Sequence, residues 1–154
     1  MHLQVRCAPH KSPADVEKLL DAVASAGINL VAIGGSDVEF GGELALVPDD
    51  GEEDRLLEAL DGYHPRVLRV DDPDSGLTLC KVENKPGALH GCIRDIATAN
   101  LAQGRIIRDI LIGVPGDDDV AAGQVPVHVY SELVRTSANV ESGQQTRTSG
   151  PTPA

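Results

Sequence analysis

Residues 84–87, Asn-Lys-Pro-Gly, lead into an apolar helical pattern and have the types best suited to bind a small molecule. Pro86 fixes φ at about −65° where the helix is entered, and Gly87 has no Cβ to obstruct a ligand. The first-turn amides near Gly87, Ala88 and Leu89 have no intrahelical acceptors, and with the positive helix end they attract a carboxylate. The segment therefore predicts a carboxylate site at a helix start.

Polar and basic side chains in this half of the chain could complete the site. Asn84 offers both a donor and an acceptor for an amino or side-chain group, so an amino acid is the predicted ligand. Lys85, Arg105 and Arg108 could help to hold an anion. Two plainer interpretations stay open, because a Pro-Gly pair is common in turns that bind nothing and basic residues are usually solvated at the surface.

The sequence contains no local pattern that predicts catalysis, a cofactor or a metal ion. Cys7, Cys80 and Cys92 lie in apolar strand and helix patterns without a CxxC pair, and such thiols usually pack as small apolar side chains. Cys7 and His10 supply only half of a zinc site, and the glycine pairs lack the spacing of a phosphate loop. We therefore expect no catalytic residue, no metal and no cofactor.

The composition argues against nucleic-acid and membrane partners. The 154 residues include 13 basic and 24 acidic side chains, for a formal charge of −11. Binding phosphates or anionic lipids needs an excess of Lys and Arg, and no apolar run approaches the roughly 20 residues that span a bilayer. Residues 1–10 lack the apolar centre of a signal peptide, and three unpaired thiols suit a reducing compartment, so we expect a cytoplasmic location.

The first half of the chain predicts the element order β-α-β-β-α-β. A first helix begins near Pro13 and ends at Gly27, and a second begins in the acidic segment 49–53. One face of the first helix has an apolar stripe at Val16, Leu19, Leu20 and Val23. Strands are predicted at residues 3–7, 28–33, 43–47 and 66–70.

The pattern restarts after a turn-forming linker at 71–76, which indicates an internal repeat. One offset of 73 residues relates Cys7 to Cys80, Pro13 to Pro86, Val16 to Leu89, Leu19 to Cys92, Leu20 to Ile93 and Val23 to Ile96. Strands follow at 77–83, 106–114 and 124–130, and Pro126 should place the last strand at an edge or a bulge. The second repeat therefore has no evident closing helix and strand.

These elements predict an α+β fold of tandem ferredoxin-like βαββαβ units, with antiparallel sheets and helices on one face of each. The units are assigned to residues 1–70 and 77–130, and residues 131–154, rich in Ser, Thr, Gly and Pro, are expected to be a disordered tail. The second sheet face of each unit would be open. A second unit or a second chain could cover it, so a homo-oligomer is also expected.

Residues 82–89, Val-Glu-Asn-Lys-Pro-Gly-Ala-Leu, resemble the start of an ACT domain. That family opens with a strand, a short polar loop ending in Pro-Gly, and a helix beginning with a small residue and Leu. The resemblance covers residues 77–130 well. Residues 3–70 share only the order of elements, and Ala14 stands where the family has Gly.

The resemblance implies a free-standing pair of regulatory domains that binds a small molecule and performs no chemistry. It also implies that the ligand lies where the Pro-Gly loop meets the second strand of a paired domain. In this chain that strand begins near Arg105, Ile107 and Arg108. The alternative hypothesis is a structural module that pairs with proteins through its sheet edges, without a small ligand.

Overall fold

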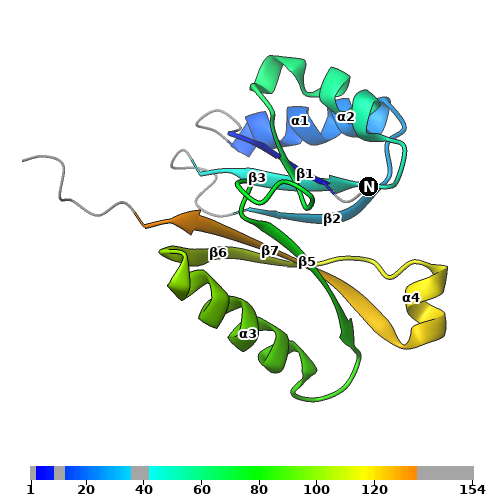
Figure 1. Ribbon diagram of the computed structural model, residues 1–154. Coiled ribbons are helices and arrows are strands. Elements are labelled where there is room, and N and C mark those ends of the chain that lie inside the picture. The colour runs from blue at the N-terminus through cyan, green and yellow to red at the C-terminus, as the bar shows by residue number, and fades with distance from the viewer. Residues whose placement is uncertain (1–2, 9–12, 36–41, 135–154) are drawn as a thin grey trace, which may run out of the picture.

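A computed structural model describes residues 3–8, 13–35 and 42–134, which form two antiparallel sheets backed by helices (Figure 1). The first unit consists of β1 (Leu3–Cys7), α1 (Pro13–Ser25), β2 (Leu30–Gly35), β3 (Leu44–Pro48), α2 (Glu53–Ala59), the short 3-10 helix η2 (Asp61–Tyr63) and β4 (Arg66–Arg69). Its strand order, β2-β3-β1-β4 with every pair antiparallel, is that of a complete ferredoxin-like unit. The predicted β-α-β-β-α-β order is confirmed.

Every residue of β1 is buried, because both faces of the strand are covered by other parts of the chain. Leu3, Val5 and Cys7 belong to the main apolar core of the first unit, which also contains residues of α1 and α2. Gln4 and Arg6 point to the opposite face, since side chains alternate along a strand. Two polar side chains are therefore buried in the middle of the molecule.

The helical stripe predicted for α1 is confirmed in part. Leu19 and Val23 are buried in the core, whereas Leu20 remains 36% exposed at the margin of the stripe. Gly27 has a φ of +65°, the left-handed conformation that commonly follows a helix. The helix therefore ends where the glycine predicted.

The second unit is built as an incomplete copy of the first, as the sequence predicted. It consists of β5 (Leu77–Glu83), α3 (Ala88–Ala102), β6 (Arg105–Ile112), α4 (Asp117–Ala122) and β7 (Gln124–Leu133). Its three strands have the order β5-β7-β6, again antiparallel. Unlike the first unit, the second unit has no helix after its third strand and no fourth strand in the part of the chain that the structure describes.

The two apolar helices occupy equivalent places, α1 between β1 and β2 and α3 between β5 and β6. Cys80, Cys92, Ile93 and Ile96 pack on a core formed by Val82, Val127 and Val129. The 73-residue offset therefore relates Leu19 to Cys92 and Val23 to Ile96 as positions that pack on a core, whereas Leu89 of the predicted stripe is 37% exposed.

Pro126 places β7 neither at an edge nor at a bulge, which corrects the sequence-based prediction. β7 is the central strand of its sheet, and Pro126 lies opposite Lys81 of β5. On the other side the Gly113 N–H donates to the Pro126 carbonyl at 2.8 Å, one residue beyond the end of β6. The ladder between β6 and β7 thus ends just before the position where an N–H group of residue 126 would have been needed. A proline is therefore tolerated in this central strand.

Two further boundaries differ from the prediction. The link between β6 and β7, expected to be a loop, contains α4, which begins in the acidic run 117–119. β7 continues to Leu133, so residues 131–133 are strand and not part of a tail. The rest of the predicted tail from residue 135 lies outside the described residues.

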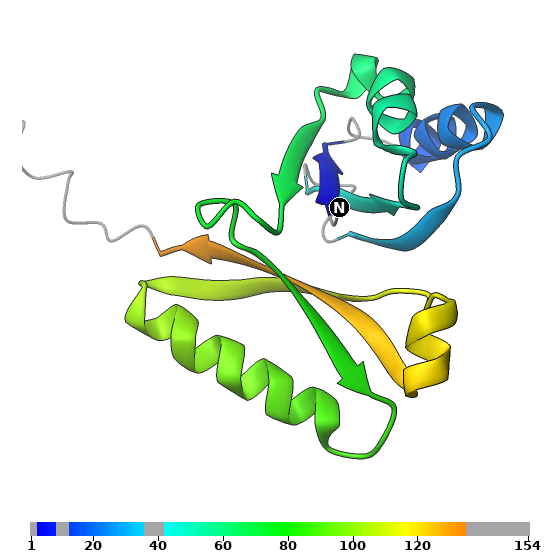
Figure 2. The same cartoon turned by 45° about the vertical axis from the view of Figure 1, so that its right-hand side comes forward.

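The two sheets face each other, with α1 and α2 outside one and α3 outside the other (Figure 2). A small apolar cluster joins them, with Ala32, Ala45 and Val47 from the first sheet and Leu111 from β6. The Val114 N–H also donates to the Val31 carbonyl at 2.7 Å. Each unit therefore covers the sheet face that was predicted to be open in the other, and this face does not require a second chain.

Candidate ligand-binding site

The predicted Pro-Gly loop lies at the far end of β5 and leads into α3. Gly87 is the N-cap residue and has a φ of +83°, and a Cβ placed on it would meet nothing within 4 Å. Backbone conformation, rather than a close approach, therefore explains the glycine. The Ala88 N–H, one of the amides predicted to hold a ligand, donates to the Lys85 carbonyl at 3.3 Å. The Lys85 ammonium itself pairs with Glu83.

The predicted residues of β6 lie at the opposite end of the sheet from this loop. β5 runs for seven residues between the two ends, which is about 20 Å. Ile107 packs against the core beneath α3, whereas Arg105 and Arg108 line a pocket. Within one chain the loop and these residues are therefore separate, and the arrangement implied by the resemblance would need a second copy.

The pocket that contains Arg105 and Arg108 lies between the two units and has a volume of about 770 Å³. This falls within the usual range of small-molecule sites. We call it the inter-unit pocket. Its walls come from β4, the linker, β6 and β7, through Arg66, Asp74, Ser75, Arg105, Ile106, Arg108, Tyr130, Ser131, Glu132, Leu133 and Val134.

Three arginines converge on the inter-unit pocket, and each keeps unused N–H groups. Arg66 uses only Nη2, which donates to Glu43 at 3.0 and 3.1 Å and to the Tyr130 hydroxyl at 3.2 Å. Arg108 uses only Nε, which donates to Glu132 at 2.9 Å. The remaining N–H groups of both find no protein acceptor among the described residues, so they are free to bind a ligand.

Arg105 differs because no carboxylate pairs with it in the part of the chain that the structure describes. Its Nη1 donates to the Ser131 carbonyl at 3.3 Å and its Nη2 to the Asp74 carbonyl at 3.2 Å. These contacts with the linker and β7 hold the guanidinium at the pocket wall. Its positive charge is therefore available to an anionic ligand.

A β-bulge places Arg108 at this wall. The register between β6 and β7 shifts between Ile107 and Asp109, which leaves Arg108 as the extra residue. Bulges re-aim side chains and often occur beside functional sites. No local pattern in the sequence predicted this bulge.

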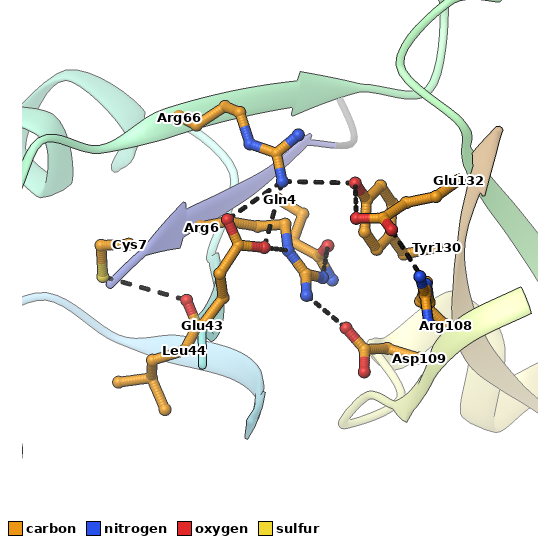
Figure 3. Close-up of polar contacts among 10 residues, drawn as sticks. All are labelled: Gln4, Arg6, Cys7, Glu43, Leu44, Arg66, Arg108, Asp109, Tyr130 and Glu132. Carbon is orange, nitrogen blue, oxygen red and sulfur yellow. Dashed lines mark hydrogen bonds and ion pairs between the residues drawn. The ribbon is translucent and has the colours of Figure 1, made fainter. Parts of the chain in front are cut away.

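Tyr130 of the second unit contacts two arginines of the first unit (Figure 3). Its ring lies 4.1 Å from the Arg6 guanidinium carbon and 5.6 Å from that of Arg66. Its hydroxyl accepts from Arg66 and donates to Glu132 at 2.9 Å. Burial and the bond to Glu132 raise the pKa of the Tyr130 hydroxyl and outweigh the opposing effect of Arg66, so the hydroxyl keeps its proton at neutral pH.

Glu132 and Asp74 are the acidic residues at the pocket, and Glu132 is the one bonded to Tyr130 and Arg108. Burial raises its pKa, but the hydrogen bonds from Tyr130 and Arg108, and the charges of Arg108 and Arg66, outweigh this and lower the pKa overall. The carboxylate is therefore ionised at neutral pH. The pocket wall thus offers both signs of charge.

Behind the pocket, the Arg6 side chain is almost completely buried between the sheets. It donates to Glu43 at 2.8 Å and to Gln4 at 3.0 Å, and it pairs with Asp109 of the second unit. Sequence reasoning missed this network, together with Arg66, Tyr130 and Glu132. The available signal was the alternation of Gln4 and Arg6 with apolar residues in β1, which placed both on the second sheet face.

A second pocket, of about 670 Å³, lies between the units nearer to α4 and has mostly acidic charges. Its charged wall residues are Asp49, Asp50, Lys81, Asp117, Asp118 and Asp119. Lys81 donates to Asp119 at 2.5 Å, and no group of three or more metal-binding side chains occurs in the described residues. Its chemistry does not suit a carboxylate ligand.

The cysteines have the character of packed thiols. Burial, aided by the charge of Glu43, raises the pKa of Cys7 to about 11. Burial and a hydrogen bond with Cys92 raise the pKa of Cys80 to about 12. A nucleophilic thiol needs a lowered pKa, so neither thiol has the pKa expected of a nucleophile.

The described helices include no segment with the length and apolar character needed to span a bilayer.

No family model matches the sequence, and no curated protein is similar to it by sequence. Solved structures with a similar fold include the ligand-free regulatory subunit of aspartate kinase from Thermus thermophilus. The two sequences are 18% identical, the match covers 84% of this chain and 82% of that chain, and the TM-score is 0.49. The aspartokinase alpha and beta subunits share 16% identity over 84% and 82% of the chains, with a TM-score of 0.49. A protein from Bacteroides thetaiotaomicron shares 17% over 84% and 77%, with a TM-score of 0.48.

Proposed function

We propose that this chain is a non-catalytic regulatory module that binds an amino acid in the inter-unit pocket. The convergence of Arg66, Arg105 and Arg108 on one pocket is the observation that carries the proposal. The chain has a formal charge of −11, so three cations around one pocket stand out against an acidic protein. The fork of N–H groups in arginine matches the geometry of a carboxylate.

The α-carboxylate would lie on the unused N–H groups of these arginines. Arg105 is the principal contact, because it donates only to carbonyl groups and lacks a carboxylate partner within the described residues. The α-ammonium would lie near the ionised carboxylate of Glu132, which also borders the pocket. A pocket with both signs of charge suits a zwitterion better than a simple anion.

Regulation follows from the position of the pocket between the units. Arg66 belongs to the first unit, whereas Arg105, Arg108 and Glu132 belong to the second. A ligand that contacts both would favour the arrangement in which both sets of groups reach it. Binding would thus be coupled to the relative placement of the two sheets, which another protein could recognise.

The ACT resemblance of residues 82–89 supports a regulatory role but implies a different place for the ligand. In a homo-oligomer, the loop with Asn84, Lys85 and Gly87 of one copy could meet β6 of another. That assembly remains part of the proposal, as does a cytoplasmic location, which the three free thiols support. The two places for the ligand are separable by mutation.

The test is a thermal-shift screen with the twenty amino acids, followed by calorimetric titration of the best ligand. Arg105→Gln should weaken binding by roughly 10- to 100-fold, because a hydrogen bond to a charged group contributes about 1.5–3 kcal/mol. Arg94→Gln is the matched control, since Arg94 is an exposed residue of α3 that pairs only with Asp95 among the described side chains.

Asn84→Ala completes the design. It should leave the affinity unchanged if the ligand lies in the inter-unit pocket. Loss of binding in Asn84→Ala, with Arg105→Gln unaffected, would move the site to the loop. If no amino acid binds, the proposal fails, and the alternative of an interaction module without a small ligand takes its place.

A further inference from the structure

The inter-unit pocket has an apolar wall beside its arginines. Ile106, Leu133 and Val134 all line it, and these residues are exposed by 42%, 62% and 48% respectively. Large aliphatic side chains left open together around one pocket are a feature of small-molecule sites, which combine apolar surface with a few polar anchors. The proposed carboxylate site does not use this wall.

Strand pairing fixes the apolar side chains next to the charged ones. Leu133 lies opposite Arg105 in the ladder between β6 and β7, and Ile106 lies opposite Glu132 in the next rung, on the other face of the sheet. All four residues border the pocket, which therefore lies at this end of the sheet. The Val134 N–H donates to the Gly104 carbonyl at 2.8 Å, which continues the pairing past the strand end. Directly opposed residues have Cβ atoms about 5 Å apart, so one small molecule can contact a charged and an apolar residue together.

We infer that the ligand is an amino acid with an aliphatic side chain, bound with its charged groups on Arg105 and Glu132 and its side chain on Ile106, Leu133 and Val134. This inference rests on the proposed function and adds the class of the ligand. The polar anchors are sufficient for the groups that all amino acids share. The apolar wall is then the part of the pocket that distinguishes one side chain from another.

Charged side chains fit this wall poorly. An acidic side chain would lose hydration against three aliphatic groups without gaining a hydrogen-bond donor from them. A basic side chain would add a positive charge beside Arg66, Arg105 and Arg108, and like charges repel. An aliphatic side chain would instead remove apolar surface from water on both partners.

The experiment is calorimetric titration of the whole chain with glycine, alanine, 2-aminobutyrate and norvaline, alongside aspartate and lysine. The dissociation constant should fall by up to about fourfold with each added methylene, because burying one stabilises by about 0.8 kcal/mol. Norvaline should bind at least about tenfold more tightly than glycine, because burying two or more methylenes at about fourfold each exceeds tenfold. It should also bind at least about tenfold more tightly than aspartate or lysine.

Ile106→Thr tests the wall itself, because it keeps a β-branched residue in β6 while replacing apolar surface with a hydroxyl. It should reduce the decrease in dissociation constant from glycine to norvaline, while the affinity for glycine stays unchanged. Ile112→Thr is the matched control, since Ile112 is 60% exposed on the same strand and lies outside the pocket. Circular dichroism of both variants checks that they fold.

The outcomes separate this inference from the proposed function. A series that changes by less than twofold from glycine to norvaline would overturn the aliphatic ligand, as would tighter binding of aspartate or lysine that still depends on Arg105. In both cases an amino acid would still bind in the pocket. If none of the six compounds binds, this inference is overturned, and the proposed function is overturned with it when none of the twenty amino acids binds.

Discussion

Arg6 of β1 and Asp109 of β6 form an ion pair that joins the two units through the space between their sheets (Figure 3). The Arg6 side chain is 4% exposed and that of Asp109 is 15% exposed. The stability of such a buried pair depends on both partners, because removing one would leave the charge of the other buried and uncompensated. The pair lies next to Tyr130, which borders the inter-unit pocket, so the connection between the units and the proposed site are parts of one network.

Removing one partner of this pair should destabilise the chain strongly. We expect Asp109→Leu to lower the free energy of unfolding by about 3 kcal/mol, since Arg6 would retain only Glu43 as a charged partner. The double variant Arg6→Met, Asp109→Leu should recover most of that loss, because an apolar pair of similar volume can replace a buried ion pair. Urea unfolding of both single variants and the double variant measures the coupling. Strictly additive effects would show that the two side chains do not interact.

Gly76 determines the shape of the pocket wall through its backbone. Its φ is +74°, and a Cβ there would overlap the Ser131 carbonyl and approach Arg105 Nη1 to 2.5 Å. Gly76→Ala should therefore both destabilise the chain and weaken ligand binding. Gly104→Ala is the control, because Gly104 has a φ of +66° but open space around its Cβ position.

The control should cost about 1–2 kcal/mol from its left-handed backbone alone. Gly76→Ala should cost about 1–3 kcal/mol more from the steric clash. Thermal unfolding and titration of both variants provide the comparison. Equal stability of the two variants would mean that the wall can move aside, and that Gly76 does not position Arg105.

The interactions of Glu132 should make part of the stability depend on pH. Its pKa in the folded chain is lowered, so the interactions contribute stability above the ordinary Glu pKa of about 4.3. That contribution is lost as the pH falls through the lowered folded-state value. Glu132→Gln should thus be less stable than wild type at about pH 7, and the difference should shrink at about pH 3, below the ordinary Glu pKa.

Urea unfolding at both pH values measures this difference, with Glu58→Gln as the control for loss of one charge, since Glu58 is an exposed residue of α2. A stability difference that is the same at both pH values would show that the Glu132 carboxylate is not held by Arg108 and Tyr130 in solution. The interpretation of Glu132 as the ammonium contact would then lose its support.

Periodicity predicted the parts of the fold that depend on local burial. Leu19 and Val23 in α1, and Cys92 and Ile96 in α3, lie on helix faces against their sheets as the repeat indicated. These residues follow from sequence because a helix presents every third or fourth side chain to the same surface. The incomplete second unit followed from the absence of a further pattern after β7.

The site was only partly predictable, because it depends on how the two sheets meet. Arg105 and Arg108 were singled out by charge, but Arg66 and Tyr130 reach the same pocket through a packing arrangement with no local pattern. Pro126 misled in the same way, since its tolerance in a central strand depends on where β6 ends. The Asn84–Gly87 turn was recognised from its residue types, yet its distance from Arg105 is a property of the sheet.

The most direct test of the proposed site is the nuclear magnetic resonance spectrum of the arginine Nε–Hε groups during titration with norvaline. The account predicts saturable shifts for Arg66, Arg105 and Arg108, with the signals of Arg55 and Arg94 unchanged because both lie outside the pocket. Arg105→Gln should abolish the remaining shifts at the same norvaline concentration. Shifts confined to the backbone amides of Gly87, Ala88 and Leu89, with all three pocket arginines unaffected, would contradict the inter-unit pocket as the ligand site.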